Sequence, residues 1–134
     1  NENRIIVDLN QYINIKKKII LPIKRIKSFY KKFSLKNSKD YGLKIEPNTI
    51  NIMDNYCILP NSHIFGYALA LCLIGQCKKI YLTGFDGNDF EDLGRDETIH
   101  LLKQFKKNYP KLKIISLTPT LFPVEKSSIY AKNL

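Results

Sequence analysis

The segment Ile64–Ile74 contains no charged residue, and folded as a helix it is apolar on nearly every side. A helix without a polar face cannot lie on a protein surface, so it packs between other layers. It is too short to cross a bilayer, which takes about 20 residues. Asn61 or Ser62 is suited to cap its start, and Gly75 its end. The small residues that would allow close packing are Gly66, Ala68 and Ala70.

Apolar runs before and after this segment predict strands. They are Tyr56–Leu59, Lys79–Thr83 and Lys113–Leu117, the last two separated by an amphipathic helix at Thr98–Tyr109. Strands that alternate with helices indicate right-handed crossovers and a parallel sheet. The fold class is therefore α/β, and the 134 residues suit one domain.

The first half and the tail are less regular. The expected elements there are a strand at Arg4–Leu9, an apolar run at Lys18–Leu21, a helix at Lys24–Phe33, a loop at Ser34–Gly42, and either two short strands or an irregular edge around Pro47. A polar loop is expected at Asn88–Asp96. After Thr120 no periodicity predicts a helix or a strand.

The net charge of +10 has two interpretations. Lysine is abundant on protein surfaces when an AT-rich genome biases composition, as the many Ile and Asn residues suggest. Alternatively the charge serves an anionic partner: nucleic acid, a phosphorylated sugar or an acidic lipid surface. In the basic stretch Lys16–Lys39 the aromatic residues fall on one helix face, which favours a core with lysines outside over nucleic-acid binding.

No apolar run is long enough to span a membrane, and the start of the chain lacks the features of a signal peptide. We therefore expect a cytoplasmic protein without a membrane span. The absence of an initial Met indicates a piece of a longer chain. Cys57, Cys72 and Cys77 lack the spacing of a zinc site and are expected to be small buried hydrophobes in a reducing compartment.

Ligands of open parallel sheets bind beyond the carboxyl ends of the strands. The first segment expected there is Asn61–Ser62–His63, at the start of the apolar helix. Free N–H groups at a helix start suit phosphate or carboxylate, and the Ser62 hydroxyl adds a donor. The alternative is ordinary helix capping.

The second segment is Gly84–Phe85–Asp86–Gly87, where Gly84 and Gly87 allow a sharp turn and close approach of a ligand. Asp86 suits a sugar hydroxyl, a proton or a hydrated divalent ion; the alternative is a solvated acidic loop in which it bonds its own turn. Further acidic residues follow up to Glu97, but their spacing is not that of an EF-hand.

The third segment carries the hydroxyls of Ser116, Thr118 and Thr120, which suit either a sugar or phosphate, or the backbone of a turn. His63 is a candidate proton donor, whereas His100 is interpreted as structural. No nucleophile triad, HExxH, Walker loop or GxGxxG is present, so no catalytic residue is assigned.

Two stretches resemble known families. "SHIFGYALALCLIGQCKKIYLTGFDG" (Ser62–Gly87) and "LLKQFKKNYPKLKIISLTPT" (Leu101–Thr120) are similar to segments of bacterial sialyltransferases. "IYLTGFDG", the acidic loop and "LTPT" resemble more closely the C-terminal domain that follows the barrel of proteins similar to 4-hydroxy-2-oxovalerate aldolase, which are associated with surface-polysaccharide genes. The resemblance covers Tyr56–Tyr130.

This resemblance implies a Rossmann-like, three-layer αβα domain at the C-terminus of a bacterial aldolase-like protein. The implied ligand is an anionic sugar or nucleotide sugar held by Asn61, Ser62, Gly84, Asp86, Gly87, Thr118 and Thr120. The implied partner is the chain's own upstream barrel, which would hold any divalent metal; the domain itself has no cofactor. No residue matches the catalytic histidine of the sialyltransferases, so the fragment alone is not expected to be catalytic.

Two other interpretations remain. One is a compact sialyltransferase-like glycosyltransferase, with Asp86 as base or sugar anchor and His63 assisting. The other is a structural domain that docks on its barrel or forms a homo-oligomer through the apolar surface at Leu121–Tyr130.

Overall fold

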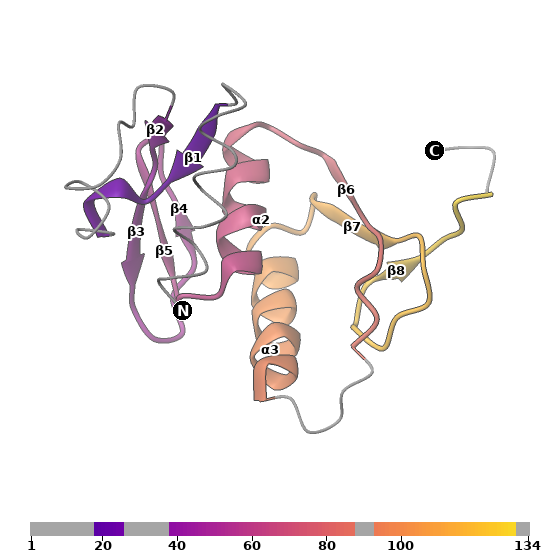
Figure 1. Cartoon of the computed structure of the whole chain (residues 1–134). Coiled ribbons are helices and arrows are strands. Elements are labelled where there is room, and N and C mark those ends of the chain that lie inside the picture. The colour runs from indigo at the N-terminus through magenta and orange to yellow at the C-terminus, as the bar shows by residue number, and fades with distance from the viewer. Residues whose placement is uncertain (1–17, 26–37, 88–92, 131–134) are drawn as a thin grey trace. The chain divides into compact units, whose positions relative to one another are not determined.

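The computed structural model describes residues 18–25, 38–87 and 93–130 (Figure 1). The chain divides into two compact units, Asn1–Leu43 and Lys44–Leu134. The expectation of one domain over residues 1–134 stays a prediction. The predicted strand Arg4–Leu9 and most of the predicted helix Lys24–Phe33 lie outside the described residues.

In the first unit, β1 (Ile19–Leu21) pairs in parallel with β2 (Ser38–Asp40). A short 3-10 helix, η1 (Ile23–Arg25), follows β1, and the Asp40 carboxylate accepts a hydrogen bond of 2.8 Å from the backbone N–H of Ile23. The run at Lys18–Leu21 is thus confirmed as strand, but the loop expected at Ser34–Gly42 is wrong at β2. Pairing with β1 outweighs the low strand propensity of these polar residues.

Two further sheets have three strands each. The first has the order β3 (Gly42–Ile45), β5 (Tyr56–Leu59), β4 (Asn51–Ile52), and its β4–β5 pair is antiparallel. The second has the order β6 (Lys79–Leu82), β7 (Lys113–Ser116), β8 (Glu125–Lys126), with both pairs parallel. Helices and parallel strands confirm the α/β class. The described strands do not form the single mainly parallel sheet that was expected.

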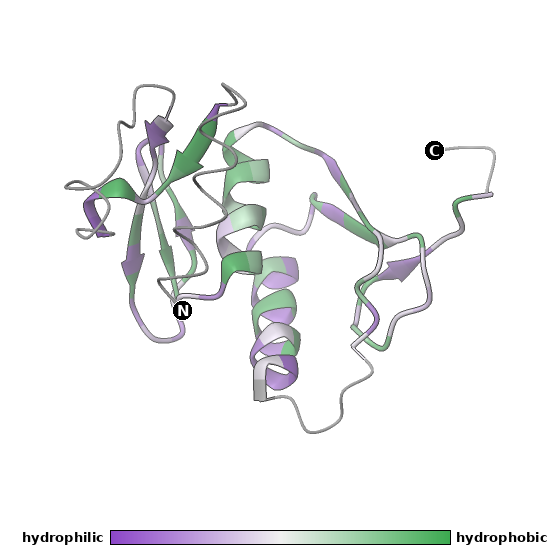
Figure 2. Ribbon diagram, viewed as in Figure 1, coloured by the Kyte–Doolittle hydropathy of each residue, from purple (hydrophilic) through white to green (hydrophobic). Residues whose placement is uncertain are grey.

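Helix α2 (Ile64–Ile74) lies exactly where the apolar segment predicted it, between β5 and β6. It packs against β4, β5 and helix α3 (Leu93–Asn108). Figure 2 shows α2 apolar along most of its length, while α3 has polar and apolar residues on different faces. Helix α3 connects the parallel strands β6 and β7, so β6–α3–β7 is a β-α-β unit.

Gly66 sets the distance between α2 and its neighbours. A Cβ atom at this position would lie 2.9 Å from Leu101 Cδ2 on α3 and 3.5 Å from Leu59 Cδ1 on β5. Leu59 and Leu101 are fully buried at this contact. Leu69, which belongs to α2 itself, is also fully buried. Close packing through small residues is thus confirmed for Gly66 and Ala70, both buried, but Ala68 is exposed.

Helix α3 and the tail after Thr120 differ from the sequence-based expectation. Helix α3 begins at Leu93 rather than at Thr98, so part of the expected loop Asn88–Asp96 is helical. Acidic residues such as Asp96 are favourable in a first helical turn, where the helix dipole is positive. The tail after Thr120 contains β8, which depends on backbone pairing with β7 and has no hydrophobic pattern that a sequence would reveal. Among the described residues, no helix is both long enough and apolar enough to cross a membrane.

We predict that Leu69→Ala lowers the free energy of unfolding by about 2–5 kcal/mol, because it leaves a cavity in a fully buried position. Ile64→Ala, on the same helix, removes a side chain that is 83% exposed and should change stability by no more than about 0.5 kcal/mol. Urea unfolding followed by circular dichroism measures both. Equal losses in the two variants would contradict the described packing of α2.

Candidate functional site

The backbone that leaves β6 is tied to the backbone that leaves β7. The two strands are parallel, with Leu82 opposite Ser116, so both chains leave the sheet at the same edge. The N–H of Gly84 donates a hydrogen bond of 3.0 Å to Thr118 Oγ1, and the N–H of Leu121 donates one of 2.9 Å to the Asp86 carbonyl. The expected convergence of these two segments is confirmed. We call Gly84–Gly87 the β6 turn and Thr118–Phe122 the β7 turn.

The hydroxyls of Ser116, at the end of β7, and of Thr118 and Thr120, after it, all bond within the chain. Ser116 Oγ donates to the Thr118 carbonyl at 2.8 Å, and Thr120 Oγ1 donates to the Phe85 carbonyl at 2.6 Å. Thr120 Oγ1 also accepts from the Phe122 N–H at 3.2 Å. Ser116 and Thr120 are buried, which favours their role in satisfying the backbone. Thr118 is half-buried and accepts from Gly84, so its own hydrogen can still be donated.

Both glycines of the β6 turn adopt left-handed backbone conformations, with φ of +66° at Gly84 and +71° at Gly87. A Cβ at Gly87 would also lie 2.9 Å from the Phe122 ring, whereas at Gly84 it would meet nothing within 4 Å. At Gly87 the missing side chain therefore makes room for the Phe122 ring of the protein itself and not for a ligand. The sharp turn expected from these glycines is confirmed.

A row of three aromatic rings connects α2 to these turns. The ring centroids of Phe65 and Phe85 are 4.6 Å apart, as are those of Phe85 and Phe122. Phe65 lies in the first turn of α2, so the start of this helix lies beside the β6 turn. The first expected segment, Asn61–Ser62–His63, therefore leads into a helix that reaches the β6 turn, although β5 belongs to a different sheet from β6 and β7. Ring packing, and not a shared sheet edge, brings it there.

The start of α2 differs from the expected capping. His63 is the N-cap residue, and its side chain makes no capping hydrogen bond. Asn61 Oδ1 accepts from the His63 N–H at 3.2 Å, and Asn61 Nδ2 donates to Glu97 Oε2 at 3.4 Å. Asn61 thus links the starts of α2 and α3, while the Ser62 side chain is exposed. The uncapped first turn retains the partial positive charge of the helix dipole.

His63 faces the interior through both ring nitrogens. Its Nε2 lies 3.3 Å from Thr98 Oγ1, whose hydrogen is donated to the Gly94 carbonyl at 2.7 Å, so Nε2–H is the donor to Thr98. Its Nδ1 is buried and has no hydrogen-bond partner among the described residues. This arrangement does not favour the proton-donor role considered for His63.

Asp86 extends an exposed side chain from the β6 turn, while its carbonyl is bonded to Leu121. Of the acidic residues that follow, Asp89, Glu91 and Asp92 lie outside the described residues, and Asp96 and Glu97 belong to α3. Over the described part of the chain, no group of three or more His, Cys, Asp or Glu side chains could hold a metal ion.

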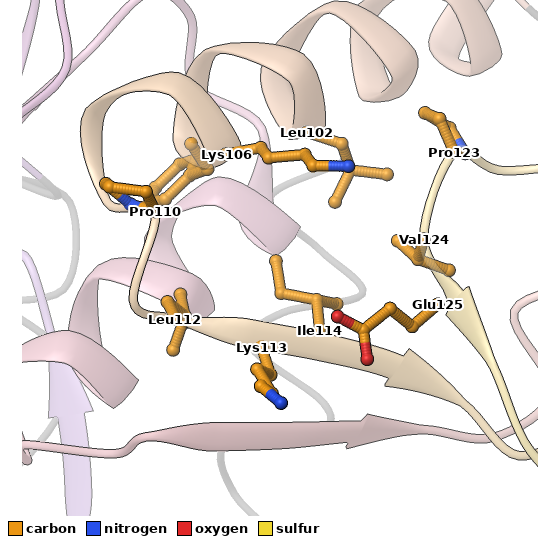
Figure 3. Close-up of a pocket in the computed structure, with 10 residues that line it drawn as sticks. Leu102, Lys106, Pro110, Leu112, Lys113, Ile114, Pro123, Val124 and Glu125 are labelled. Atoms are coloured by element: carbon orange, nitrogen blue, oxygen red, sulfur yellow. The ribbon is translucent and has the colours of Figure 1, made fainter.

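Two pockets lie away from these turns, and the sequence analysis missed both. One, of about 120 Å³, lies between α3 and strands β7 and β8 (Figure 3). Leu102 and Lys106 line it from α3, while Ile114, Val124 and Glu125 line it from the sheet side. Because β8 has no sequence signal, this pocket could not be anticipated. The other, of about 290 Å³, lies beside the end of α2 and includes Cys77.

No protein-family model matches this chain, and neither a curated protein nor a solved structure matches it.

We predict that Gly84→Ala destabilises the protein by about 1 kcal/mol, the cost of a left-handed conformation for a residue with a side chain. Gly87→Ala has the same backbone cost and also forces the Phe122 ring to move, which adds about 1–3 kcal/mol. Chemical unfolding of the two variants measures the difference. If Gly84→Ala were the more destabilising of the two, the packing of Phe122 on Gly87 would be wrong.

We predict that Thr120→Val lowers stability by about 1–3 kcal/mol, because it leaves the Phe85 carbonyl and the Phe122 N–H without their buried partner. Thr49→Val removes a hydroxyl whose 3.2 Å bond to the Pro47 carbonyl is exposed to solvent, and it serves as the control with a change within about 0.5 kcal/mol. Thermal denaturation compares them. A neutral Thr120→Val would show that this hydroxyl does not hold the two turns together.

Proposed function

We propose that Lys44–Leu134 is a ligand-binding unit that takes an anionic sugar or nucleotide sugar where the β6 turn, the β7 turn and the start of α2 meet. The observation that carries this proposal is the joining of three separate segments by the Gly84–Thr118 hydrogen bond and the Phe65–Phe85 contact. Chain segments from distant parts of a sequence, held rigidly at strand ends, are a common arrangement of binding sites in α/β proteins.

Where the two turns and the start of α2 meet, some groups suit an anion and others suit sugar hydroxyls. The uncapped start of α2, with the exposed Ser62 hydroxyl beside it, offers N–H groups and positive potential for a phosphate or carboxylate. The exposed Asp86 carboxylate and the Thr118 hydroxyl suit the neutral sugar hydroxyls. The net charge of +10 would attract an anionic ligand from a distance.

The proposal also includes a more specific fold and a parent protein for this unit. The β6–α3–β7 unit is the element from which Rossmann-like, three-layer αβα domains are built, and this is what supports a Rossmann-like classification. The relation to aldolase-like proteins of surface-polysaccharide synthesis rests on the sequence resemblance alone. In this proposal the unit is a non-catalytic accessory of an upstream barrel in the cytoplasm. Any divalent metal belongs to that barrel, and the unit binds neither nucleic acid nor a cofactor of its own.

A structural role is the second candidate. Leu121, Ile129 and Tyr130 are 48%, 54% and 92% exposed, an unusual set of large apolar side chains at the end of one unit. Such side chains favour docking on the chain's own barrel or on a second copy. Analytical ultracentrifugation of the wild type and of Tyr130→Ser tests self-association.

The binding proposal predicts that a cytidine or uridine nucleotide, or a sugar phosphate, raises the melting temperature of the full chain. A ligand at a hundred times its dissociation constant stabilises by about 2.7 kcal/mol. Asp86→Asn and Ser62→Ala should each weaken binding by about tenfold, or about 1.4 kcal/mol, because the first replaces a charged acceptor oxygen by an amide NH2 and the second removes a hydroxyl. Thermal shift assays with and without magnesium measure these effects.

Asp54→Asn is the matched control, because Asp54 is exposed in the same unit but lies between β4 and β5. It should bind as the wild type does. No shift with any of these ligands would leave only the structural role. Equal shifts in wild type and Asp86→Asn would remove Asp86 from the site.

A further inference from the structure

The end of α2 brings two cysteines together. The Cys77 N–H donates to the Cys72 carbonyl at 3.0 Å, and the Gln76 N–H donates to the Leu73 carbonyl at 2.8 Å. Gln76 has a left-handed φ of +58°, and Gly75 is the C-cap. This pair of bonds defines a Schellman motif, in which the side chains at the positions of Cys72 and Cys77 regularly touch. Usually that contact is hydrophobic, but here both members are thiols.

The two thiols are in contact but differ in their surroundings. All three cysteines are free; Cys77 is exposed, Cys72 is half-buried and Cys57 is buried. The Cys72 and Cys77 side chains are hydrogen-bonded to each other. Burial raises the pKa of Cys72 above its ordinary value, and the neighbouring Cys77 raises it further by charge repulsion and by this hydrogen bond. Burial raises the pKa of Cys57 to about 11, which keeps that thiol protonated and unreactive.

Cys77 is also the thiol that a small molecule can reach. It lines the pocket of about 290 Å³ together with Leu73, Tyr109 and Lys111. The pocket walls are mainly apolar side chains and two lysine stems, and there is room for a small oxidant. Accessibility therefore assigns the first attack to Cys77, and the contact places Cys72 as its resolving partner.

We propose that Cys72 and Cys77 form a redox-modification site that a peroxide converts reversibly into an intrachain disulfide. The Cys77 thiolate attacks one oxygen of hydrogen peroxide, the O–O bond breaks, and a sulfenic acid and hydroxide result. The Cys72 thiolate then attacks the Cys77 sulfur, the S–O bond breaks, and a second hydroxide leaves. Protons from the two thiols convert both hydroxides to water, so two thiols and one peroxide give one disulfide and two waters.

The contact between Cys72 and Cys77 disfavours ionisation of Cys72 in the reduced protein. After Cys77 is oxidised, the same contact favours the second step, the attack of Cys72 on the Cys77 sulfur. Conversion of Cys77 to a neutral sulfenic acid removes the charge repulsion that helps to raise the pKa of Cys72 in the reduced protein. The Schellman motif already holds the two residues close in the reduced protein. The disulfide ties the last turn of α2 to the segment that enters β6.

The test is titration of the reduced full chain with hydrogen peroxide, followed by thiol alkylation in denaturant, which makes Cys57 accessible, and by peptide mass mapping. We expect loss of two thiols, a linked peptide containing Cys72 and Cys77, and full reversal by dithiothreitol. Cys57 in the same molecules is the internal control and should remain alkylatable. Oxidation of Cys57 at the same rate, or over-oxidation of Cys77 without a link to Cys72, would overturn the proposal.

Single variants separate the two roles. Cys72→Ala should stop at a sulfenic acid on Cys77 that dimedone captures, whereas Cys77→Ala should react with peroxide at least about tenfold more slowly. Gln76→Gly keeps the left-handed residue of the motif and should form the disulfide as fast as the wild type. Gln76→Val disfavours that conformation and should slow it. Equal rates in Gln76→Gly and Gln76→Val, with circular dichroism showing both folded, would mean that the motif does not position the thiols.

Discussion

The close contact of α2 with α3 and β5 at Gly66 is the constraint on which the second unit depends. A Cβ at this position would lie only 2.9 Å from Leu101 Cδ2, so a residue without a side chain lets Leu101 approach this closely, while Leu59 Cδ1 lies at ordinary contact distance. Dispersion and burial of apolar area are then concentrated at one place, where Leu69 is also buried. Because α2 is fixed here near its start, its two ends are fixed too. One end lies at the β6 turn through Phe65 and Phe85, and the other presents the two thiols.

The hydrogen bonds between the β6 and β7 turns explain why this part of the unit has a definite shape without regular structure. Backbone groups without regular structure need partners: the buried hydroxyls of Ser116 and Thr120 supply two of them, and Thr118 accepts from the exposed N–H of Gly84. Buried hydroxyls used in this way position a site and do not themselves bind a ligand. The proposed binding function rests on the groups that remain accessible, which are Ser62, Asp86 and the half-buried Thr118. The same logic separates Cys57, a packing residue, from the accessible Cys77.

Much of the second unit could be predicted because local patterns there are strong. The apolar segment, its terminal Gly75 and the short runs around it gave α2, β5, β6 and β7 within one residue of the observed bounds. The glycines of the β6 turn were recognised because only they adopt positive φ easily. Polar segments were harder. The start of α3 and strand β2 were mistaken for loops, since helix dipoles and strand partners are not visible in a polar sequence.

The sequence by itself determined which segments are helices and strands and where the chain turns, because hydrophobic periodicity and backbone sterics act over a few residues. It also determined that a Gly and two Cys residues surround the end of an apolar helix. Only the tertiary structure decided how strands group into sheets, that the start of α2 meets the β6 turn through aromatic rings, and that Ser116 and Thr120 face inward. These depend on contacts between residues far apart in the chain, and pairing partners are chosen by packing of the whole unit and not by local preference.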